Sequence, residues 1–384
     1  MIKSPTITQG LTLLRNFGRL AYVIKLVIRA QAQKSRYNKQ TKAMPTPAPQ
    51  SLILVTGVTG YLAAHVAEQL LDKGYRVRGT ARTASKAEYL KKKWGDRFEW
   101  VNVSDLIEDG AFDEAVKDVD GIMHVASPFH YNVSDPYKDL IEPARKGTLS
   151  LLSAALKNGK KVQRIVITSS FAACAEPKDG SGYIYTEKDW NEFSIKEVEQ
   201  KGKETSPQQA YRASKSEAER VAWDFIKEKK PQFDLVTINP TFIFGPILHQ
   251  VEDPKDLNTS VAFVYKMLTG ETKEIAAPAP SQAFVDVRDV AKAHVNAIEK
   301  EEAGGKRFLT TSAQFGFQQV ADILRAKYPE LKDKIPEGKP GQNYSTTHSV
   351  SNEEAKRVLN IEFMGLEKTI VDTAEDLKEK FLQK

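Results

Sequence analysis

The stretch VTGVTGYLAAH, residues 55–65, follows the apolar run SLIL and opens a helical pattern. Gly57, Gly60 and Ala63 stand in it in a Gly-x-x-Gly-x-x-Ala order. The first glycine allows a tight turn, the second lets the backbone approach a pyrophosphate, and the small third residue lets the helix pack closely on the strand. The phosphates would then lie at the positive N-terminus of the helix. The stretch therefore predicts a dinucleotide site. Residues assigned to it here are Gly57, Thr59, Gly60, Tyr61 and Leu62.

Short β-branched runs alternate with helical stretches from residue 51 to residue 240. The runs are SLILVTG, YRVRGTAR, FEWVNV, DGIMHVAS, VQRIVITSS and FDLVTINP, with helices expected between them at 61–73, 84–94, 111–117, 137–158 and 206–230. Such alternation indicates βαβ units in an α/β fold with a Rossmann-like, doubly wound parallel sheet. After Pro240 the pattern is irregular and Pro-rich, and the later helices are expected around 286–300, 316–327 and 366–381.

Three parts follow from this organisation. Residues 1–50 form an extension and linker, residues 51–240 a Rossmann domain, and residues 241–384 a smaller, mainly substrate-binding lobe with some elements returning to the Rossmann core.

The formal charge of +6 is unevenly placed along the chain. Residues 1–50 hold nine basic side chains and no acidic one, so the remaining 47 basic residues face all 50 acidic residues in 51–384. Residues 51–384 are therefore slightly acidic and lack the excess of basic residues that is typical of a nucleic-acid-binding surface. The single cysteine, Cys174, excludes an internal disulfide framework and is expected to be a small buried apolar residue.

Residues 11–30, LTLLRNFGRLAYVIKLVIRA, have the pattern of a cationic amphipathic helix. Their basic residues leave no apolar run of the ~18 residues that a membrane span needs. Three interpretations stay open: a mitochondrial presequence, an anchor that contacts a membrane surface, or a dispensable extension before a start at Met44. We expect a cytoplasmic protein, with a mitochondrial location as the alternative.

The end of the second strand, VRGTARTASK, predicts which dinucleotide binds. A carboxylate at this position would bind the ribose 2′-hydroxyl of NAD, whereas an arginine accommodates the 2′-phosphate of NADP. Arg82 and Lys86 stand here, and no acidic residue occurs before Glu88. NADPH is therefore the expected cofactor.

Tyr211 and Lys215, in YRASKSEAER, are one of three Tyr-x-x-x-Lys matches; the others begin at Tyr89 and Tyr328. Only Tyr211 lies on the long helix that follows the fifth strand, so only it and Lys215 share a face toward the nicotinamide end. The other two matches are interpreted as surface coincidences. The fifth strand ends in IVITSS, which places Thr168, Ser169 and Ser170 at the carboxyl edge where ligands bind in open α/β sheets.

Eight stretches in order carry a family resemblance: VTGVTGYLAAH, GYRVRGTAR, SDLIEDGAFDEA, HVASPF, VITSS, YRASKSEAER, NPTFIFGP and FVDVRDVAKAH. Through them the chain resembles the extended short-chain dehydrogenases/reductases over residues 51–380. It looks most like the dihydroflavonol and cinnamoyl-CoA reductases and the yeast-type NADPH-dependent aldehyde, ketone and methylglyoxal reductases. SPFHYNVSDP and LNTS favour the aldehyde and ketone reductases. The resemblance implies an NADPH-dependent reductase of a small carbonyl compound, acting as a monomer or homodimer.

The resemblance also implies a catalytic triad of Ser170, Tyr211 and Lys215. Carbonyl reduction needs a hydride at carbon and a proton at oxygen. A free phenol has a pKa of about 10, so the pKa of Tyr211 must be lowered for it to act as an acid near neutral pH. The Lys215 ammonium, one turn away, supplies that field and can hold the nicotinamide ribose. Alignment to the family pattern selects Ser170 over Ser169, and successive strand residues face opposite ways.

Further positions are carried over from the same resemblance. Asp105 and Leu106 match the adenine contact, while Ala126, Ser127 and Thr168 would lie beside the cofactor. Pro240 and Thr241 would flank the nicotinamide. The candidate walls of an apolar substrate pocket are Phe129, Phe171 and Phe242.

Three alternatives are weighed against this function. The histidines lack metal-binding spacing, so no metal site is expected. A nucleotide-sugar epimerase or dehydratase would share the glycine turn and the Tyr-Lys pair, but NPTFIFGP stands where those enzymes carry an Arg-containing stretch. A non-catalytic NADPH-binding regulator would not need both Tyr211 and Lys215.

Overall fold

A seven-stranded parallel sheet organises the computed structural model, which describes residues 46–127, 133–178, 182–275, 282–342 and 348–382. The chain divides into two units, Met1–Ala43 and Met44–Lys384, and the sheet belongs to the second. Its order is β10-β7-β5-β4-β1-β2-β3, so the order reverses between β1 and β4, where α/β sheets bind ligands. The strands are β1 (Leu52–Val55), β2 (Arg76–Ala81), β3 (Phe98–Asn102), β4 (Gly121–His124), β5 (Arg164–Thr168), β7 (Asp234–Pro240) and β10 (Arg307–Thr310).

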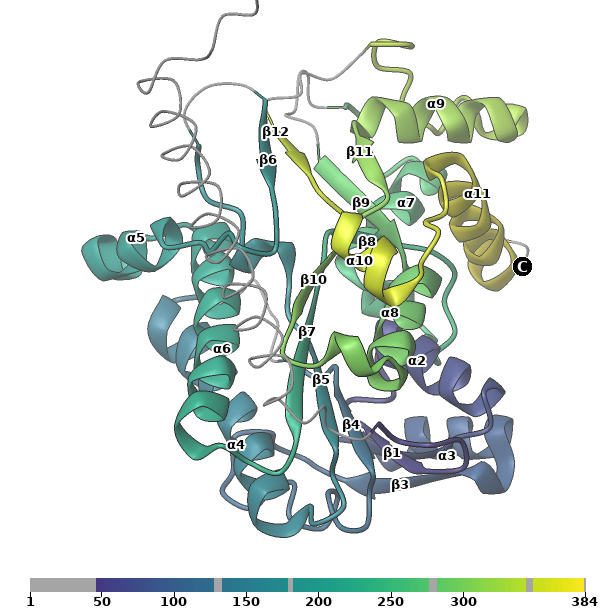
Figure 1. Cartoon of the computed structure of the whole chain (residues 1–384). Coiled ribbons are helices and arrows are strands. Elements are labelled where there is room, and N and C mark those ends of the chain that lie inside the picture. Colours follow the sequence, from purple (N-terminus) through teal and green to yellow (C-terminus); the bar gives the residue numbers. More distant parts are fainter. Residues whose placement is uncertain (1–45, 128–132, 179–181, 276–281, 343–347, 383–384) are drawn as a thin grey trace, which may run out of the picture. The chain divides into compact units, whose positions relative to one another are not determined.

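Helices cover both faces of this sheet, which explains why its central strands are buried throughout. One face packs against α2 (Tyr61–Asp72), α3 (Ala84–Trp94) and α8 (Val287–Glu299). The other packs against α4 (Glu142–Asn158) and α6 (Pro207–Lys229), which run side by side in Figure 1. A short π-helical stretch, Tyr137–Ile141, precedes α4. The α/β fold class and four of the five expected helices are confirmed.

The helix expected at 111–117 is absent, and turns take its place. Gly110 and Asp118 have positive φ values of 77° and 60°, which break helical geometry on both sides. The segment left between them holds only about two helical turns. Its apolar positions nevertheless behave as expected, because Phe112 and Val116 are fully buried against the sheet.

The chain after β7 builds a second, smaller sheet and returns to the main one. Strands β8 (Phe242–Phe244), β9 (Gln282–Asp286) and β11 (Ala313–Phe315) pair in the order β11-β9-β8. The helices α7 (Thr259–Thr269), α9 (Phe317–Lys327) and α11 (Leu366–Leu377) enclose a separate core beside them. The expected helices near 286–300, 316–327 and 366–381 correspond to α8, α9 and α11. The seventh strand, β10, is a four-residue run that the sequence analysis missed.

A pair of short strands completes the described structure. β6 (Tyr183–Tyr185) pairs in parallel with β12 (His348–Val350), joining segments more than 160 positions apart. Two further helices are α5 (Phe193–Lys201), which packs on α6, and α10 (Glu353–Leu359), which packs on β10 and α8. In the ranges described above, no helix is long and apolar enough to cross a bilayer.

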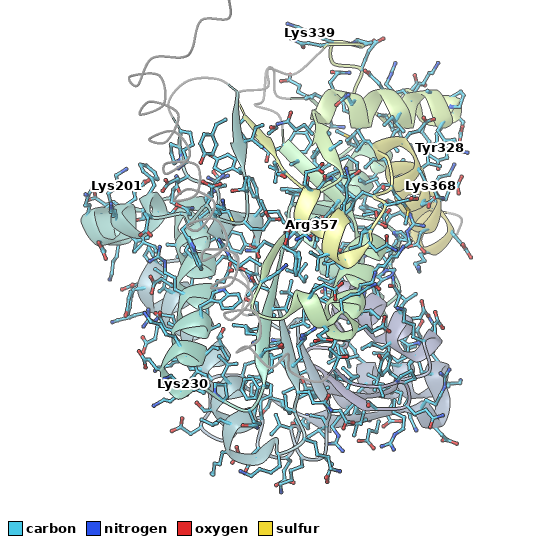
Figure 2. The ribbon with its side chains drawn as sticks, in the orientation of Figure 1. Lys201, Lys230, Tyr328, Lys339, Arg357 and Lys368 are labelled. Carbon is cyan, nitrogen blue, oxygen red and sulfur yellow. The ribbon has the colours of Figure 1, made fainter. Side chains whose placement is uncertain are left out.

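The two coincidental Tyr-x-x-x-Lys matches differ in their environment. Tyr89 is 42% exposed, as expected for a surface match. Tyr328 is only 6% exposed, so its assignment to the surface is wrong. Helix α9 ends at Lys327, because Pro329 restricts the backbone of Tyr328, the residue before it. The Tyr328 ring lies beside α11, and the Lys378 Nζ is 4.0 Å from the ring centroid (Figure 2). Tyr328 is a packing residue between two helices.

Candidate active site

The glycine turn between β1 and α2 has the geometry of a phosphate cradle. Gly57 has φ +63°, and a Cβ on it would lie 3.0 Å from the Cβ of Ala126, so only glycine fits. A Cβ on Gly60 would lie 3.2 Å from the Gly57 carbonyl oxygen. Gly60 is also the N-cap of α2 and offers no side chain to cap it. The first backbone N–H groups of α2 therefore suit a pyrophosphate.

The other residues assigned to this turn have different environments. Thr59 is half-buried, whereas Leu62 is buried in the core, so that only its backbone can face a phosphate. The Tyr61 hydroxyl donates a hydrogen bond to the Gly245 carbonyl oxygen at 2.9 Å. Tyr61 thereby connects the start of α2 to the segment after β8.

Arg82 and Lys86 lie just beyond the carboxyl end of β2, and both are exposed. Within the described part of the chain neither forms an ion pair. Two cations at this position suit the 2′-phosphate of NADP, and no carboxylate stands among them to bind the 2′-hydroxyl of NAD.

Two pairs of predicted cofactor residues follow β3 and β4. Asp105 is exposed, and its Oδ1 accepts a hydrogen bond from the Ile107 N–H at 3.0 Å, while Leu106 is half-buried. The Ala126 N–H donates to Thr56 Oγ1 at 3.0 Å. Both Ala126 and Ser127 therefore stand at the switch point, next to the glycine turn.

Tyr211 and Lys215 lie one turn apart near the start of α6, which Ser206 caps. The Lys215 Nζ is 5.9 Å from the Tyr211 ring centroid and donates a hydrogen bond to Ser127 Oγ at 2.9 Å. Burial lowers the pKa of Lys215 to about 8. The Lys215 ammonium thus connects α6 to the segment after β4, next to the glycine turn.

The two serines after β5 point to different surroundings, as strand alternation predicts. Ser169 is 6% exposed, and its hydroxyl donates to the buried Glu219 carboxylate at 2.6 Å. Both serines line the cavity that holds Tyr211, and the Ser170 Oγ accepts a hydrogen bond from the Ala172 N–H at 3.1 Å. Thr168 also reaches that cavity, although its Oγ1 lies 2.6 Å from the His294 Nε2.

A buried charge network supports the end of β5. Glu219 pairs with Arg307 at 2.6 Å and accepts a hydrogen bond from the Asn239 amide at 2.7 Å. The same amide donates to the Ser170 carbonyl oxygen at 3.2 Å. Burial would raise the pKa of Glu219, but the Arg307 charge and these hydrogen bonds lower it overall. Cys174, fully buried as expected, lies 3.1 Å from the Arg307 guanidinium, and burial raises the pKa of its thiol.

A cavity of about 680 Å³ collects these groups. The predicted residues that line it are Tyr61, Thr168, Ser170, Phe171, Tyr211, Lys215, Pro240, Thr241 and Phe242. Phe171 stacks edge-on against Tyr185, with ring centroids 5.3 Å apart, and Phe242 is 36% exposed. Phe129 lies outside the described residues.

Several cavity residues were not found from the sequence. Gln208 and Arg212 share a face of α6, four residues apart, and this spacing was a usable signal beside the Tyr-Lys pair. Tyr185 and His348 reach the cavity only through the pairing of β6 with β12, with ring centroids 5.2 Å apart. The local sequence of neither segment predicts this contact.

Comparisons with known proteins show the family of this chain. Residues 53–309 match the NAD dependent epimerase/dehydratase family. The chain is 39% identical to the ketoreductase azaE of Aspergillus niger, with 85% of this chain and 98% of that protein aligned. It is 34% identical to the NADPH-dependent methylglyoxal reductase GRE2 of Saccharomyces cerevisiae, with 85% and 97% aligned.

Solved structures show the same architecture. The yeast methylglyoxal/isovaleraldehyde reductase Gre2 complexed with NADPH superposes with a TM-score of 0.76 at 34% identity, over 85% of this chain and 98% of that one. The Candida albicans Gre2 complex with NADPH gives 0.78 at 36% identity, over 86% and 99%. A Thermotoga maritima UDP-glucose 4-epimerase, at 22% identity and a TM-score of 0.65, shares the fold.

Proposed function

This chain belongs to the NAD dependent epimerase/dehydratase family, and we propose that within it the chain is an NADPH-dependent reductase of aldehydes or ketones. One observation carries the proposal: Ser170, Tyr211 and Lys215 line a single cavity, and Lys215 is hydrogen-bonded to Ser127 next to the glycine turn. Tyr61, the first residue of α2, also lines this cavity. A carbonyl compound and a dinucleotide can therefore meet there.

The residues divide the chemistry as follows. When bound, NADPH supplies the hydride that goes to the carbonyl carbon. The Tyr211 hydroxyl donates its proton to the carbonyl oxygen as negative charge develops on it. The Lys215 ammonium stabilises the resulting phenolate, and the Ser170 hydroxyl donates a hydrogen bond to the same oxygen. Solvent then returns a proton to Tyr211, and the product is an alcohol.

The substrate class that we propose is a small aldehyde or ketone, such as a 2-oxoaldehyde or an aliphatic or aryl carbonyl compound. A cavity of about 680 Å³ suits such a ligand. Phe171, Phe242 and Ile243 supply apolar surface in the cavity that Tyr211 also lines. The named relatives include reductases of methylglyoxal and isovaleraldehyde.

The alternatives fit less well. The two relatives compared above, azaE and GRE2, are both reductases and are 39% and 34% identical to this chain. The epimerase structure is 22% identical and shares only the fold. A regulator that binds NADPH without turnover would leave the Tyr211–Lys215 pair without a use.

The test follows NADPH oxidation with methylglyoxal, isovaleraldehyde and a bulky aryl ketone. We expect turnover of at least one, and Tyr211→Phe should lower kcat by about 100-fold or more while NADPH binding changes little. Tyr89→Phe is the matched control, because Tyr89 has the same spacing to a lysine but is exposed on α3. Absence of turnover with every carbonyl, or full activity in Tyr211→Phe, would refute the proposal.

A further inference from the structure

Arg212 is a half-buried cation that forms no ion pair with any residue that the structure describes. It follows Tyr211 on α6 and lines the same cavity. The one hydrogen bond of its guanidinium among the described residues is long, from Nη1 to the Ala175 carbonyl oxygen at 3.4 Å, and the guanidinium forms no ion pair there. A guanidinium carries five N–H donors, so most of its hydrogen-bonding capacity is unused. Burial lowers the pKa of Arg212, which is the mark of a charge that lacks compensation.

The other cations of the cavity have partners. Lys178 pairs with Glu176 at 2.7 Å, and Glu176 also accepts hydrogen bonds from backbone N–H groups. Lys215 donates to Ser127. Among the described lining residues the cations are Lys178, Arg212 and Lys215 and the one acid is Glu176. The cavity is therefore positive overall, and its excess charge lies at Lys215, beside Tyr211, and at Arg212.

The position of Arg212 on α6 separates it from the reacting atoms. Tyr211 and Lys215 occupy one face of the helix, and Gln208 and Arg212 are centred about 60° around the helix from them. Gln208 belongs to the first turn of this 23-residue helix, where the helix dipole is positive. The positive end of the helix dipole and the Arg212 guanidinium, which lies beside Ala175, thus both favour an anion in this cavity.

We propose that Arg212 determines specificity by binding an oxyanionic group of the substrate, chiefly a carboxylate, while the carbonyl lies at Tyr211. The inference rests on the proposed reductase function and narrows its substrate class to oxo acids. A guanidinium holds a carboxylate through two parallel hydrogen bonds, which fixes orientation as well as affinity. The carboxylate would take up the donors that Arg212 leaves unused.

The test compares ω-oxo carboxylic acids of four to eight carbons with their methyl esters. For the wild-type protein with NADPH, kcat/KM should favour the acid of the best length by about tenfold or more, as expected for hydrogen bonds to a charged group. Arg212→Met should bring the acid-to-ester ratio close to one, mainly by raising KM for the acid. Arg212→Lys should keep part of the preference, because it keeps the charge but loses the paired geometry.

Matched controls and a second readout keep the test decisive. Arg76→Met removes a guanidinium that is exposed at the start of β2 and should leave the ratio unchanged. Calorimetric binding of the hydroxy acid product to the NADP⁺-loaded protein gives the same comparison without turnover. A keto phosphate compared with its keto alcohol shows whether phosphate binds in place of carboxylate.

Equal kcat/KM for acids and esters in the wild type, or an unchanged ratio in Arg212→Met, would overturn the role of Arg212. That result is distinct from failure of the proposed function, in which the neutral esters and methylglyoxal would not be reduced either. If turnover fails, the calorimetric Kd still decides: loss of hydroxy acid binding in Arg212→Met supports the role, and equal binding refutes it.

Discussion

At Lys215 the fold keeps an ammonium largely away from water. Burial lowers its pKa to about 8, and the nearby His124, also buried, has its pKa lowered to about 3 and stays neutral. Of these two groups, Lys215 therefore carries the positive charge near Tyr211 at neutral pH. This charge is useful for proton transfer and costly for folding.

Two pH effects should follow for Lys215. Activity should fall above about pH 8, as the ammonium deprotonates and its field on Tyr211 is lost.

The second effect is on stability. Because the pKa of Lys215 in the folded protein lies below its unfolded value of about 10.4, its charge destabilises the fold fully below pH 8 and less as pH rises toward 10.4. Lys215→Met should therefore abolish turnover yet raise the free energy of unfolding at pH 7 by about 1–2 kcal/mol.

Urea unfolding of both proteins at pH 7 and pH 9.5 measures this difference. The gain in Lys215→Met should shrink at the higher pH. A variant that is less stable than the wild type at both pH values would show that the hydrogen bond to Ser127 outweighs the cost of burial.

Arg82 allows a prediction on cofactor choice. Arg82→Ala should raise KM for NADPH by about tenfold or more and change KM for NADH much less, because only NADPH carries the 2′-phosphate. Arg76→Ala is the control: Arg76 begins the strand that Arg82 follows and is also exposed. Steady-state kinetics with both cofactors measures the effect, and an equal rise in both KM values would contradict the assignment.

At the scale of elements, the Glu219–Arg307 pair joins α6 to β10 beneath the end of β5. Glu219 has no exposed side-chain surface and also accepts hydrogen bonds from Thr237 and Asn239. Arg307 donates to backbone carbonyl oxygens before α5, and its guanidinium lies 3.8 Å from the Trp190 ring centroid. The pair thus holds together elements on both sides of Ser170.

Loss of Arg307 should be far more damaging than loss of a surface arginine. Arg307→Met leaves Glu219 buried without its counter-charge and should lower the free energy of unfolding by about 3–5 kcal/mol. Arg357→Met is the control, because Arg357 pairs with Glu354 at the surface of α10 (Figure 2) and should cost about 0–1 kcal/mol. Adding Glu219→Leu to Arg307→Met should restore part of the stability, and a further loss would contradict this account.

At the scale of the whole molecule, the described site residues all lie in the unit Met44–Lys384. We propose that residues 1–43 are not needed for catalysis. A protein of residues 44–384 should keep kcat/KM within about twofold and an unchanged Tm. Carbonyl reduction and calorimetry of both lengths measure this, and a marked loss of either property would contradict it.

A separate experiment decides what residues 1–43 do in the cell. We infer a cytoplasmic enzyme, so a fluorescent reporter that carries residues 1–43 should stay diffuse. A mitochondrial signal would favour the presequence, and a membrane-bound signal would favour the anchor through residues 11–30.

Much of this protein follows from its sequence alone. The glycine turn, the parallel sheet and the faces of the long helices depend on local periodicity and on backbone geometry at single positions such as Gly57. The Tyr211–Lys215 pair could be chosen among three matches because its place along an alternating chain determines its place at the sheet edge. The 111–117 segment shows the limit of periodicity, since its apolar pattern was right and its backbone was not.

Only the tertiary structure determined the rest of the cavity. Tyr185 and His348 meet because two three-residue strands pair across more than 160 residues, and β10 joins the sheet as a four-residue strand. The packing of Tyr328 between two helices, and the lack of an ion pair at Arg212 among the described residues, depend on what folds against them. Local sequence carries propensity and pattern, whereas burial and charge compensation are properties of contacts between distant segments.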